Sequence, residues 1–196
     1  HGPRYFPALA QQGTQSAQMF TSAAGGGAES IQLMYLMSIA ASRATLQLSM
    51  AYFIPDQLAV QALIAAVRRG VRVQIILPSG HIDRAVLRRA SRSRWGPLLE
   101  AGVEIYECQP TMYHCKVLIV DAEWVSVGST NFDNRSLTIN DEANLNVHDR
   151  GFATDQARLF EADLTRSQRI TLAEWQARTA WDKLLDSLAG ALGSQL

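Results

Sequence analysis

The feature that most constrains the fold is a helical segment followed at once by a β-branched strand. Residues 55–70 read PDQLAVQALIAAVRRG, with Pro55 and Asp56 where a helix starts and Gly70 just past its end. The next residues, 71–78, read VRVQIILP, a composition typical of a buried strand. Strands that alternate with helices in this way predict an α/β fold.

The rest of the chain extends this pattern. Helices are predicted at residues 31–42, 81–102 (interrupted near Gly96-Pro97) and 152–167, and strands at 44–53, 103–107, 114–120, 124–129 and 142–147. Because the last three strands follow one another closely, the sheet is expected to be mixed. The chain divides into a linker or lead-in at residues 1–28, a main domain at 29–168 and a C-terminal amphipathic helix at 169–196.

The C-terminal segment is predicted to be a helix for two reasons. TLAE, which begins at Thr171, resembles a capping box. Apolar residues then recur at helical spacing: Trp181, Leu184, Leu185, Leu188 and Leu192. We expect this helix to dock on the core. A helix that lies on a membrane surface is the alternative, although the polar side of the segment has few basic residues.

Charge and composition disfavour several classes of function. The chain has 18 basic and 18 acidic residues, and this balance disfavours nucleic acid as a partner. Cys108 and Cys115 make neither a disulfide framework nor a metal cluster. The most apolar helical stretch, residues 31–41, is too short to cross a bilayer. The sequence begins HGPRYFP rather than with Met, so we expect a piece of a longer protein.

Candidate catalytic residues gather in HCKVLIVD, residues 114–121, which holds one of only two lysines in the chain. Side chains alternate along a strand, so His114 and Lys116 share one face. There they form a cationic patch that is costly to bury unless an anion meets it. Asp121 lies on the opposite face and is predicted to be structural.

The following hairpin is expected to enlarge this patch. If its turn contains two residues, Lys116 pairs with Ser129 and His114 with Asn131, and directly paired residues share a face. These four polar side chains would then surround a space suited to a tetrahedral oxyanion. Gly128 would let the backbone come close to that anion.

A histidine nucleophile also needs a partner that selects its tautomer and stabilises the imidazolium. Glu142 begins a strand that can run beside the hairpin, and it is the first candidate. Asp141 is the alternative, because an error of one residue in register exchanges the two.

These residues resemble a known family. The segment from His114 to Asn131 matches the H-x-K-x4-D-x6-G-S-x-N (HKD) motif of the phospholipase D superfamily at every position. The flanking stretches AYFIPD, RRGVRVQIILPS, LLEAGVEIYE and NFDNRSLTINDEANLNV resemble the second half of bacterial cardiolipin synthases. Two departures, Ala51 for the usual Pro and Cys115 for a small residue, are not expected to alter the chemistry.

The resemblance implies a phosphohistidine mechanism that uses no metal and no cofactor. His114 and Lys116 would be catalytic, Asp121 a structural motif residue, and Glu142 the carboxylate that orients the histidine. The phosphate would be held by three further motif residues, Gly128, Ser129 and Asn131. The implied reaction is phosphatidyl transfer from a phosphatidylglycerol-like anionic phospholipid to a lipid hydroxyl, on the cytoplasmic side of the bacterial inner membrane, with peripheral attachment.

The mechanism needs two histidines, and with lysines only at 116 and 183 the chain has one HKD motif. The chain is therefore expected to be the C-terminal HKD half that works with an N-terminal half, with His114 as the general acid. Two alternatives stay open: a self-paired single-motif phosphodiesterase or nuclease that forms a homodimer, and an inactive half that binds phosphate or lipid.

A group of arginines precedes the motif: Arg84, Arg88, Arg89, Arg92 and Arg94. Two interpretations of this group are open. The arginines form either a solvated helix face or a surface that attracts anionic lipid headgroups.

Overall fold

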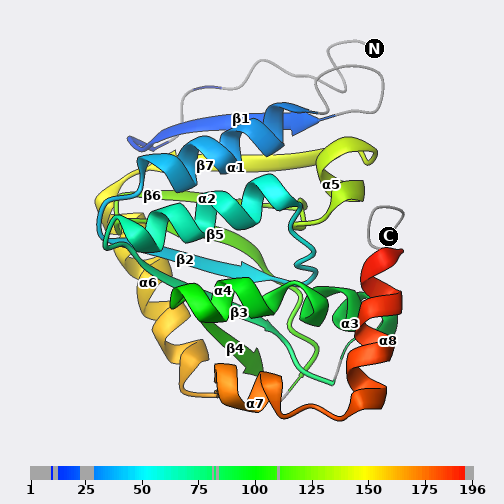
Figure 1. Cartoon of the computed structure of the whole chain (residues 1–196). Coiled ribbons are helices and arrows are strands. Elements are labelled where there is room, and N and C mark those ends of the chain that lie inside the picture. The colour runs from blue at the N-terminus through cyan, green and yellow to red at the C-terminus, as the bar shows by residue number, and fades with distance from the viewer. Residues whose placement is uncertain are drawn as a thin grey trace.

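A single mixed sheet forms the centre of the protein in the computed structural model, which describes residues 10, 13–22, 29–80, 82, 84–109 and 111–192. The eight strands lie in the order β1-β7-β6-β5-β2-β3-β4-β8 (Figure 1). They are β1 (Ser16–Ser22), β2 (Thr45–Met50), β3 (Arg72–Pro78), β4 (Glu104–Cys108), β5 (Lys116–Val120), β6 (Trp124–Gly128), β7 (Glu142–His148) and β8 (Ser167–Ile170). β2, β3 and β4 pair in parallel and the other neighbours pair antiparallel. The predicted α/β fold with a mixed sheet is confirmed.

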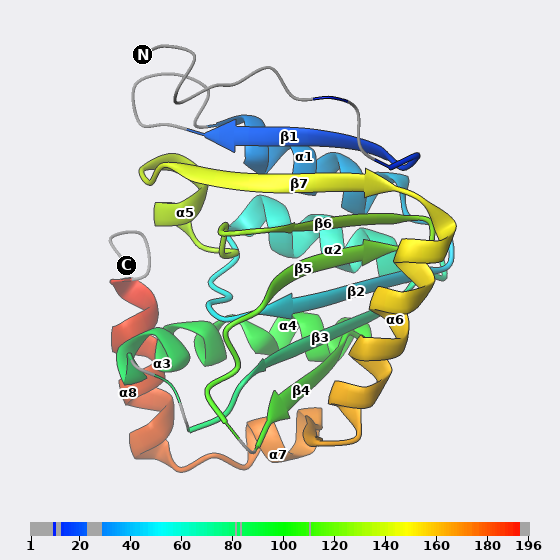
Figure 2. The same cartoon turned by 180° about the vertical axis from the view of Figure 1, so that it is seen from behind.

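Helices cover both faces of this sheet. They are α1 (Glu29–Ala41), α2 (Gln57–Arg68), α3 (Ala85–Ser93), α4 (Trp95–Ala101), α5 (Asn134–Thr138), α6 (Arg150–Leu164), α7 (Leu172–Gln176) and α8 (Ala180–Ala191). α1, α2 and α4 lie on one face (Figure 1), and α6 crosses the other (Figure 2). α5, α3 and α8 stand together at one end of the strands in both views.

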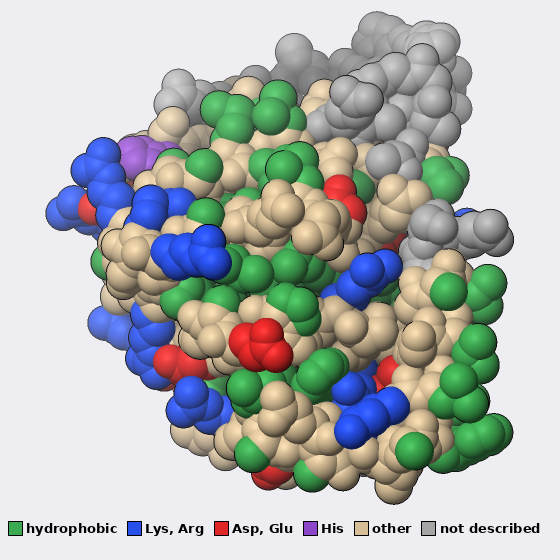
Figure 3. Space-filling view, viewed as in Figure 1, with side chains coloured by type: hydrophobic (Ala, Val, Ile, Leu, Met, Phe, Trp, Pro, Cys, Tyr) green, Lys and Arg blue, Asp and Glu red, His purple; other side chains and the backbone are tan. Residues whose placement is uncertain are grey.

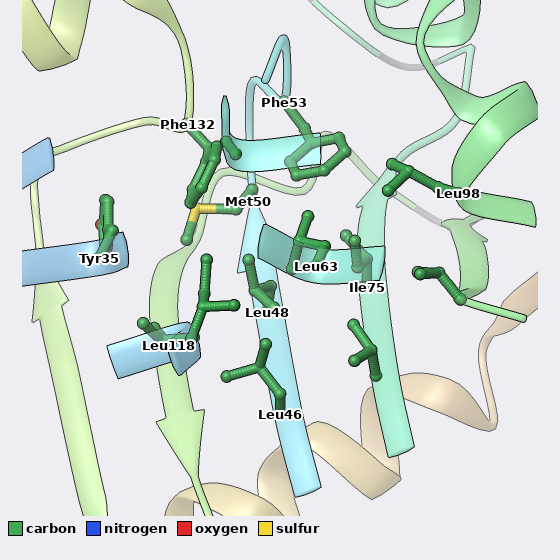
Figure 4. Packing of buried hydrophobic residues seen from close by; sticks show 14 of the residues in the cluster. Tyr35, Leu46, Leu48, Met50, Phe53, Leu63, Ile75, Leu98, Leu118 and Phe132 are labelled. Carbon is green, nitrogen blue, oxygen red and sulfur yellow. The ribbon is translucent and has the colours of Figure 1, made fainter. Parts of the chain in front are cut away.

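The larger core lies between the sheet and α1, α2 and α4. Leu46, Leu48 and Met50 project from β2 toward this side, where they meet Leu63 of α2 and Leu118 of β5 (Figure 4). All five are fully buried, and burying a side chain of this size contributes about 1.5–3 kcal/mol. The alternate residues of β2 face α6, and one of them, Gln47, hydrogen-bonds Glu161 there at 3.1 Å. The alternation of side chains along β2 thus sends its apolar residues to the larger core and its polar residues toward α6.

The interruption predicted near Gly96-Pro97 falls two residues earlier. α3 ends at Ser93, and α4 begins at Trp95 after Arg94. Pro97 is thereby placed in the first turn of α4, where its missing N–H leaves no hydrogen bond unmade.

Two edge strands were not predicted. The prediction of a linker at residues 1–28 is wrong for residues 16–22, which pair along their whole length with β7 as β1; residues 1–9, 11–12 and 23–28 lie outside the described part. The helix predicted at 152–167 ends at Leu164, and residues 167–170 form β8 against β4. Neither segment has a strong strand pattern of its own, and pairing with the open edges of β7 and β4 accounts for their strand conformation.

The C-terminal helix packs through the face opposite to the one predicted. α8 lies along α3, where Asp186 is 2% exposed and Gly190 abuts Ser93 so closely that a Cβ would collide with it. Trp181 and most of the leucines expected to face the core are exposed instead. The capping box predicted at Thr171 is present at the start of α7.

The arginines of α3 match neither open interpretation, because most of them pair with acidic residues. Arg88 contacts Glu107 of β4 at 2.6 Å, and Arg92 lies 3.5 Å from the same carboxylate. Arg89 contacts Asp186 of α8 at 3.2 Å. These ion pairs attach α3 to the sheet and to α8.

Candidate active site

The residues of the motif lie at one end of three neighbouring antiparallel strands. Lys116 begins β5, Gly128 ends β6 and Glu142 begins β7. Because neighbouring strands run in opposite directions, these three positions meet at the same end of the sheet. We call it the site end; α5 and α3 lie beside it (Figure 2).

The predicted register of the hairpin is wrong by one residue. Val120 pairs with Trp124, so the turn contains three residues, and the same register sets Lys116 opposite Gly128 rather than Ser129. Asp121 and Ala122 adopt left-handed backbone angles, with φ of 54° and 50°.

Asp121 holds this turn against β2. Its Oδ1 accepts hydrogen bonds from the backbone N–H groups of Ala44 and Thr45, both at 2.8 Å, and its Oδ2 accepts one from Arg43 at 2.9 Å. The carboxylate lies at the end of the hairpin opposite to the site end. We therefore propose that its part in the motif is structural.

His114 and Lys116 approach each other at the site end. Lys116 Nζ lies 2.9 Å from His114 Nδ1 and 3.3 Å from the backbone oxygen of His114. The lysine is 8% exposed whereas the imidazole is exposed. The Tyr52 ring meets the imidazole edge-on, with 6.0 Å between ring centroids. A buried ammonium beside an accessible imidazole is an arrangement that favours an incoming anion.

The neighbouring Tyr113 anchors this segment from the other face, and sequence reasoning missed it. Its Oη hydrogen-bonds Ser49 Oγ of β2 at 2.8 Å and Asp163 Oδ2 of α6 at 2.9 Å. Burial raises the pKa of Tyr113, so the hydroxyl stays protonated and able to donate. Cys115, also on this face, packs with the core under α6 and points away from His114, as expected.

Ser129 and Glu142 form a second pair at the site end. The Ser129 hydroxyl donates to Glu142 and accepts from the N–H of Ala143 at 3.1 Å. Asn140 Nδ2 donates to the other Glu142 oxygen at 3.2 Å. In the described part of the chain Glu142 hydrogen-bonds Ser129 and Asn140, so its orientation of His114 stays a prediction. Asp141, the alternative, is exposed.

Asn131 and the start of α5 complete this side of the site. Asn131 Nδ2 donates to Ser136 at 3.5 Å, while its Oδ1 is buried without a hydrogen-bond partner within the described structure. Asp133 caps α5 by accepting from the N–H of Ser136 at 2.9 Å. Burial raises the pKa of Asp133, and the nearby charge of Glu142 raises it further.

Asn144 is a supporting residue that the motif does not include. Fully buried, it accepts from the hydroxyl of Thr130 at 2.7 Å and donates to Ser126 at 2.9 Å and Tyr35 at 3.1 Å. A Cβ at Gly128 would collide with it, so the glycine serves this contact. The alternating asparagines of EANLNV could have revealed Asn144 from the sequence. Buried asparagines on one face of a strand need hydrogen-bond partners, and this need points to a polar network.

The fold and these residues define a phospholipase D-like domain with one HKD motif. The family model described as "Cardiolipin synthase, PLD-like domain" matches residues 35–164. The chain belongs to this family. Among the residues that the structure describes, no group of three or more His, Cys, Asp or Glu could hold a metal ion.

Curated relatives and solved structures agree with this assignment. Cardiolipin synthase A of Serratia proteamaculans is 36% identical over 91% of this chain and 36% of the relative. The minor cardiolipin synthase ClsB of Bacillus subtilis is 33% identical over 97% of this chain and 46% of the relative. The chain thus spans less than half the length of these relatives.

Two solved structures share the fold. A phospholipase D family member, Nuc from Salmonella typhimurium, has a TM-score of 0.67 and 24% identity, over 81% of this chain and 99% of that one. Phosphatidylserine synthase from Haemophilus influenzae has a TM-score of 0.69 and 14% identity, over 95% of this chain and 47% of that one.

Proposed function

We propose that the chain is the C-terminal HKD half of a cardiolipin synthase-type phosphatidyltransferase. The observation that carries the proposal is the contact of 2.9 Å between Lys116 Nζ and His114 Nδ1. It occurs at the site end of a chain that belongs to this family. The named relatives are cardiolipin synthases along more than nine tenths of the chain.

The reaction proceeds in two displacements through a phosphohistidine. A histidine of a second motif attacks the phosphorus of phosphatidylglycerol, and an N–P bond forms as the P–O bond to glycerol breaks. His114, as general acid, protonates the leaving glycerol oxygen. It then takes the proton from an incoming lipid hydroxyl, which attacks phosphorus and releases the histidine.

The other motif residues hold the phosphoryl group. Lys116 places its charge against the phosphoryl oxygens as negative charge develops on them. Ser129, once its hydroxyl turns from Glu142 to the ligand, and Asn131, through the second N–H of its Nδ2, donate hydrogen bonds to the same oxygens. Glu142 orients the imidazole of His114 and stabilises its protonated form.

The second histidine comes from an N-terminal HKD half of the same protein or from a second copy of this chain. We propose that the reaction, with an anionic phospholipid as substrate, takes place at the cytoplasmic side of the inner membrane and that the protein attaches there peripherally. No helix in the described ranges is long and apolar enough to span a bilayer.

Incubation of the purified chain with phosphatidylglycerol vesicles, followed by mass spectrometry of the lipids, tests the activity. We expect cardiolipin and glycerol when the second histidine is supplied, by an added N-terminal HKD half or by a second copy of the chain, and we expect His114→Ala to remove both. His148→Ala is the matched control, since His148 is exposed at the opposite end of β7. Nicked plasmid DNA without cardiolipin would instead establish the self-paired nuclease, and turnover by a strict monomer in sedimentation would contradict the two-histidine mechanism.

A second measurement tests the phosphate site without turnover. Titration with orthophosphate should move the NMR signals of the His114 ring and leave those of His148 in place. Lys116→Met should abolish the response, because it removes the charge that meets the anion. An unchanged His114 spectrum at saturating phosphate would argue against an oxyanion site here.

A further inference from the structure

α8 presents an unusual exposed surface. Four large apolar side chains, Trp181, Leu184, Leu188 and Leu192, are 66%, 49%, 57% and 52% exposed. Their spacing of three or four residues sets them along one side of the helix. We call this set the α8 stripe. In Figure 3 the hydrophobic side chains gather along the right-hand margin of the molecule, over α8.

The opposite side of α8 carries the charges that hold the helix in place. Asp186, 2% exposed, contacts Arg178, and it lies 3.2 Å from Arg89 of α3. Asp182 accepts from the Thr179 hydroxyl at 2.7 Å and lies 3.4 Å from Arg89. Because Asp186 is buried in this ion cluster, the helix cannot rotate to bury its leucines without breaking the cluster.

The outward side of α8, along the stripe, is apolar and carries no charged side chain. Lys183 is exposed and the Asp182 side chain is 43% exposed, but with about 3.6 residues per turn both lie roughly 100° or more around the helix from the centre of the stripe. The boundary between headgroups and acyl chains of a phospholipid bilayer complements an uncharged apolar face that carries a tryptophan.

The stripe also lies at the same end of the molecule as the motif. α8 stands with α3 and α5 beside the site end (Figure 2). Further exposed apolar side chains belong to segments at this end: Val86 of α3, Met112 just before His114, and Ile139 just after α5. The apolar surface therefore belongs to the part of the molecule that must meet the substrate.

We propose that the α8 stripe inserts into the boundary between headgroups and acyl chains of a phospholipid bilayer and so presents the site end to lipid headgroups. Helices of this kind lie about 5–10 Å deep in that boundary. The proposal rests on the proposed function for the substrate, but its test does not require turnover.

Trp181 gives a direct signal for insertion. The other three tryptophans are shielded: Trp95 is 1% exposed, and Trp124 and Trp175 are partly buried. Mixing the chain with vesicles of phosphatidylglycerol and phosphatidylcholine should shift the emission to shorter wavelength, and brominated acyl chains should quench it. Trp181→Phe should lose both responses.

Flotation with the same vesicles measures binding. Leu184→Gln combined with Leu188→Gln should lower the partition coefficient at least about tenfold, the loss expected when one leucine no longer leaves water. Leu159→Gln combined with Leu58→Gln is the matched control, since these leucines are 59% and 55% exposed on α6 and α2. The control should bind vesicles as the unaltered chain does.

Three outcomes would overturn the proposal: no Trp181 shift with vesicles, equal vesicle binding by both double variants, or a change of oligomeric state in the stripe variant without a change in vesicle binding. The last would assign the stripe to a second copy. His114→Ala should keep vesicle binding intact. If the chain binds vesicles but forms no cardiolipin, the proposed function is contradicted and the membrane role of the α8 stripe is not. If cardiolipin forms and the stripe variant binds vesicles as the unaltered chain does, the membrane role of the stripe is contradicted and the proposed function is not.

Discussion

Replacing Asp121 tests whether the motif aspartate acts through the turn rather than through the chemistry. In Asp121→Ala the three backbone N–H groups of residues 43–45 lose their acceptor. In Asp121→Asn the remaining carbonyl oxygen can keep the bonds to Ala44 and Thr45, while the bond from Arg43 and the charge are lost. Asp121→Ala should therefore lower the free energy of unfolding more than Asp121→Asn does.

The magnitude follows from the hydrogen bonds. Bonds to a charged acceptor contribute roughly 1.5–3 kcal/mol each when buried, and less where water can replace them, as at the exposed Arg43 and Ala44. We expect Asp121→Ala to lower the free energy of unfolding by about 2–4 kcal/mol and Asp121→Asn by about 1 kcal/mol. Ala122→Gly should raise it by about 0.5–1 kcal/mol, because Ala122 has a φ of 50°.

Urea denaturation with a constant m-value measures these differences. The corresponding change in melting temperature for Asp121→Ala is a decrease of about 4–15 °C in a chain of this length. Hydrogen exchange should show the loss of protection at residues 43–45 before any other backbone amide. A loss below 0.5 kcal/mol for Asp121→Ala, or an equal loss for the alanine and asparagine variants, would refute the assignment of Asp121 to the turn.

Other predictions concern the support of the site and the acid stability. Gly128→Ala should lower the free energy of unfolding by about 1–3 kcal/mol, because a Cβ collides with Asn144 and the backbone of β7; a neutral result in urea denaturation would contradict this close approach. Asn144→Ala should cost about 2–4 kcal/mol, since buried partners such as Thr130 lose their hydrogen bonds, and it should weaken phosphate binding if the network positions the site. Burial opposes ionisation of Glu104, but hydrogen bonds from Arg72 and its neighbours lower its pKa from 4.5 to about 2, so its contribution to stability is present above pH 4.5 and is lost as the pH falls toward 2. Glu104→Gln should remove that part of the pH dependence, and parallel curves for the two proteins in acid would show that Glu104 contributes none of it.

Local sequence predicted the central elements well because their patterns are strong. α2 begins after Asp56, whose side chain accepts from the N–H of Ala59 at 2.7 Å, and ends before Gly70 with φ of 91°. The β-branched run that follows became β3. Motif spacing likewise identified His114 and Lys116 as neighbours, since residues two apart in a strand share a face.

The turn was predicted less well because its geometry depends on a distant contact. Nothing within residues 114–131 shows that Asp121 binds the N–H groups that precede β2, and this contact selects the three-residue turn. With the register shifted, Ser129 binds Glu142 rather than lying opposite Lys116. Single-residue errors of register are therefore expected wherever a loop is held by another part of the chain.

The sequence by itself determined the α/β class, the motif and the end of the sheet where its residues lie, because these depend on local periodicity and on spacing along one chain. Tertiary structure alone decided the edge strands β1 and β8, the turn register and the orientation of α8. Each of these depends on a partner remote in sequence: an open strand edge, a set of backbone N–H groups, or a buried cluster of arginines and aspartates. The apolar spacing of α8 showed that a helix would form, but the ion pairs of Asp186 decided that its leucines face outward.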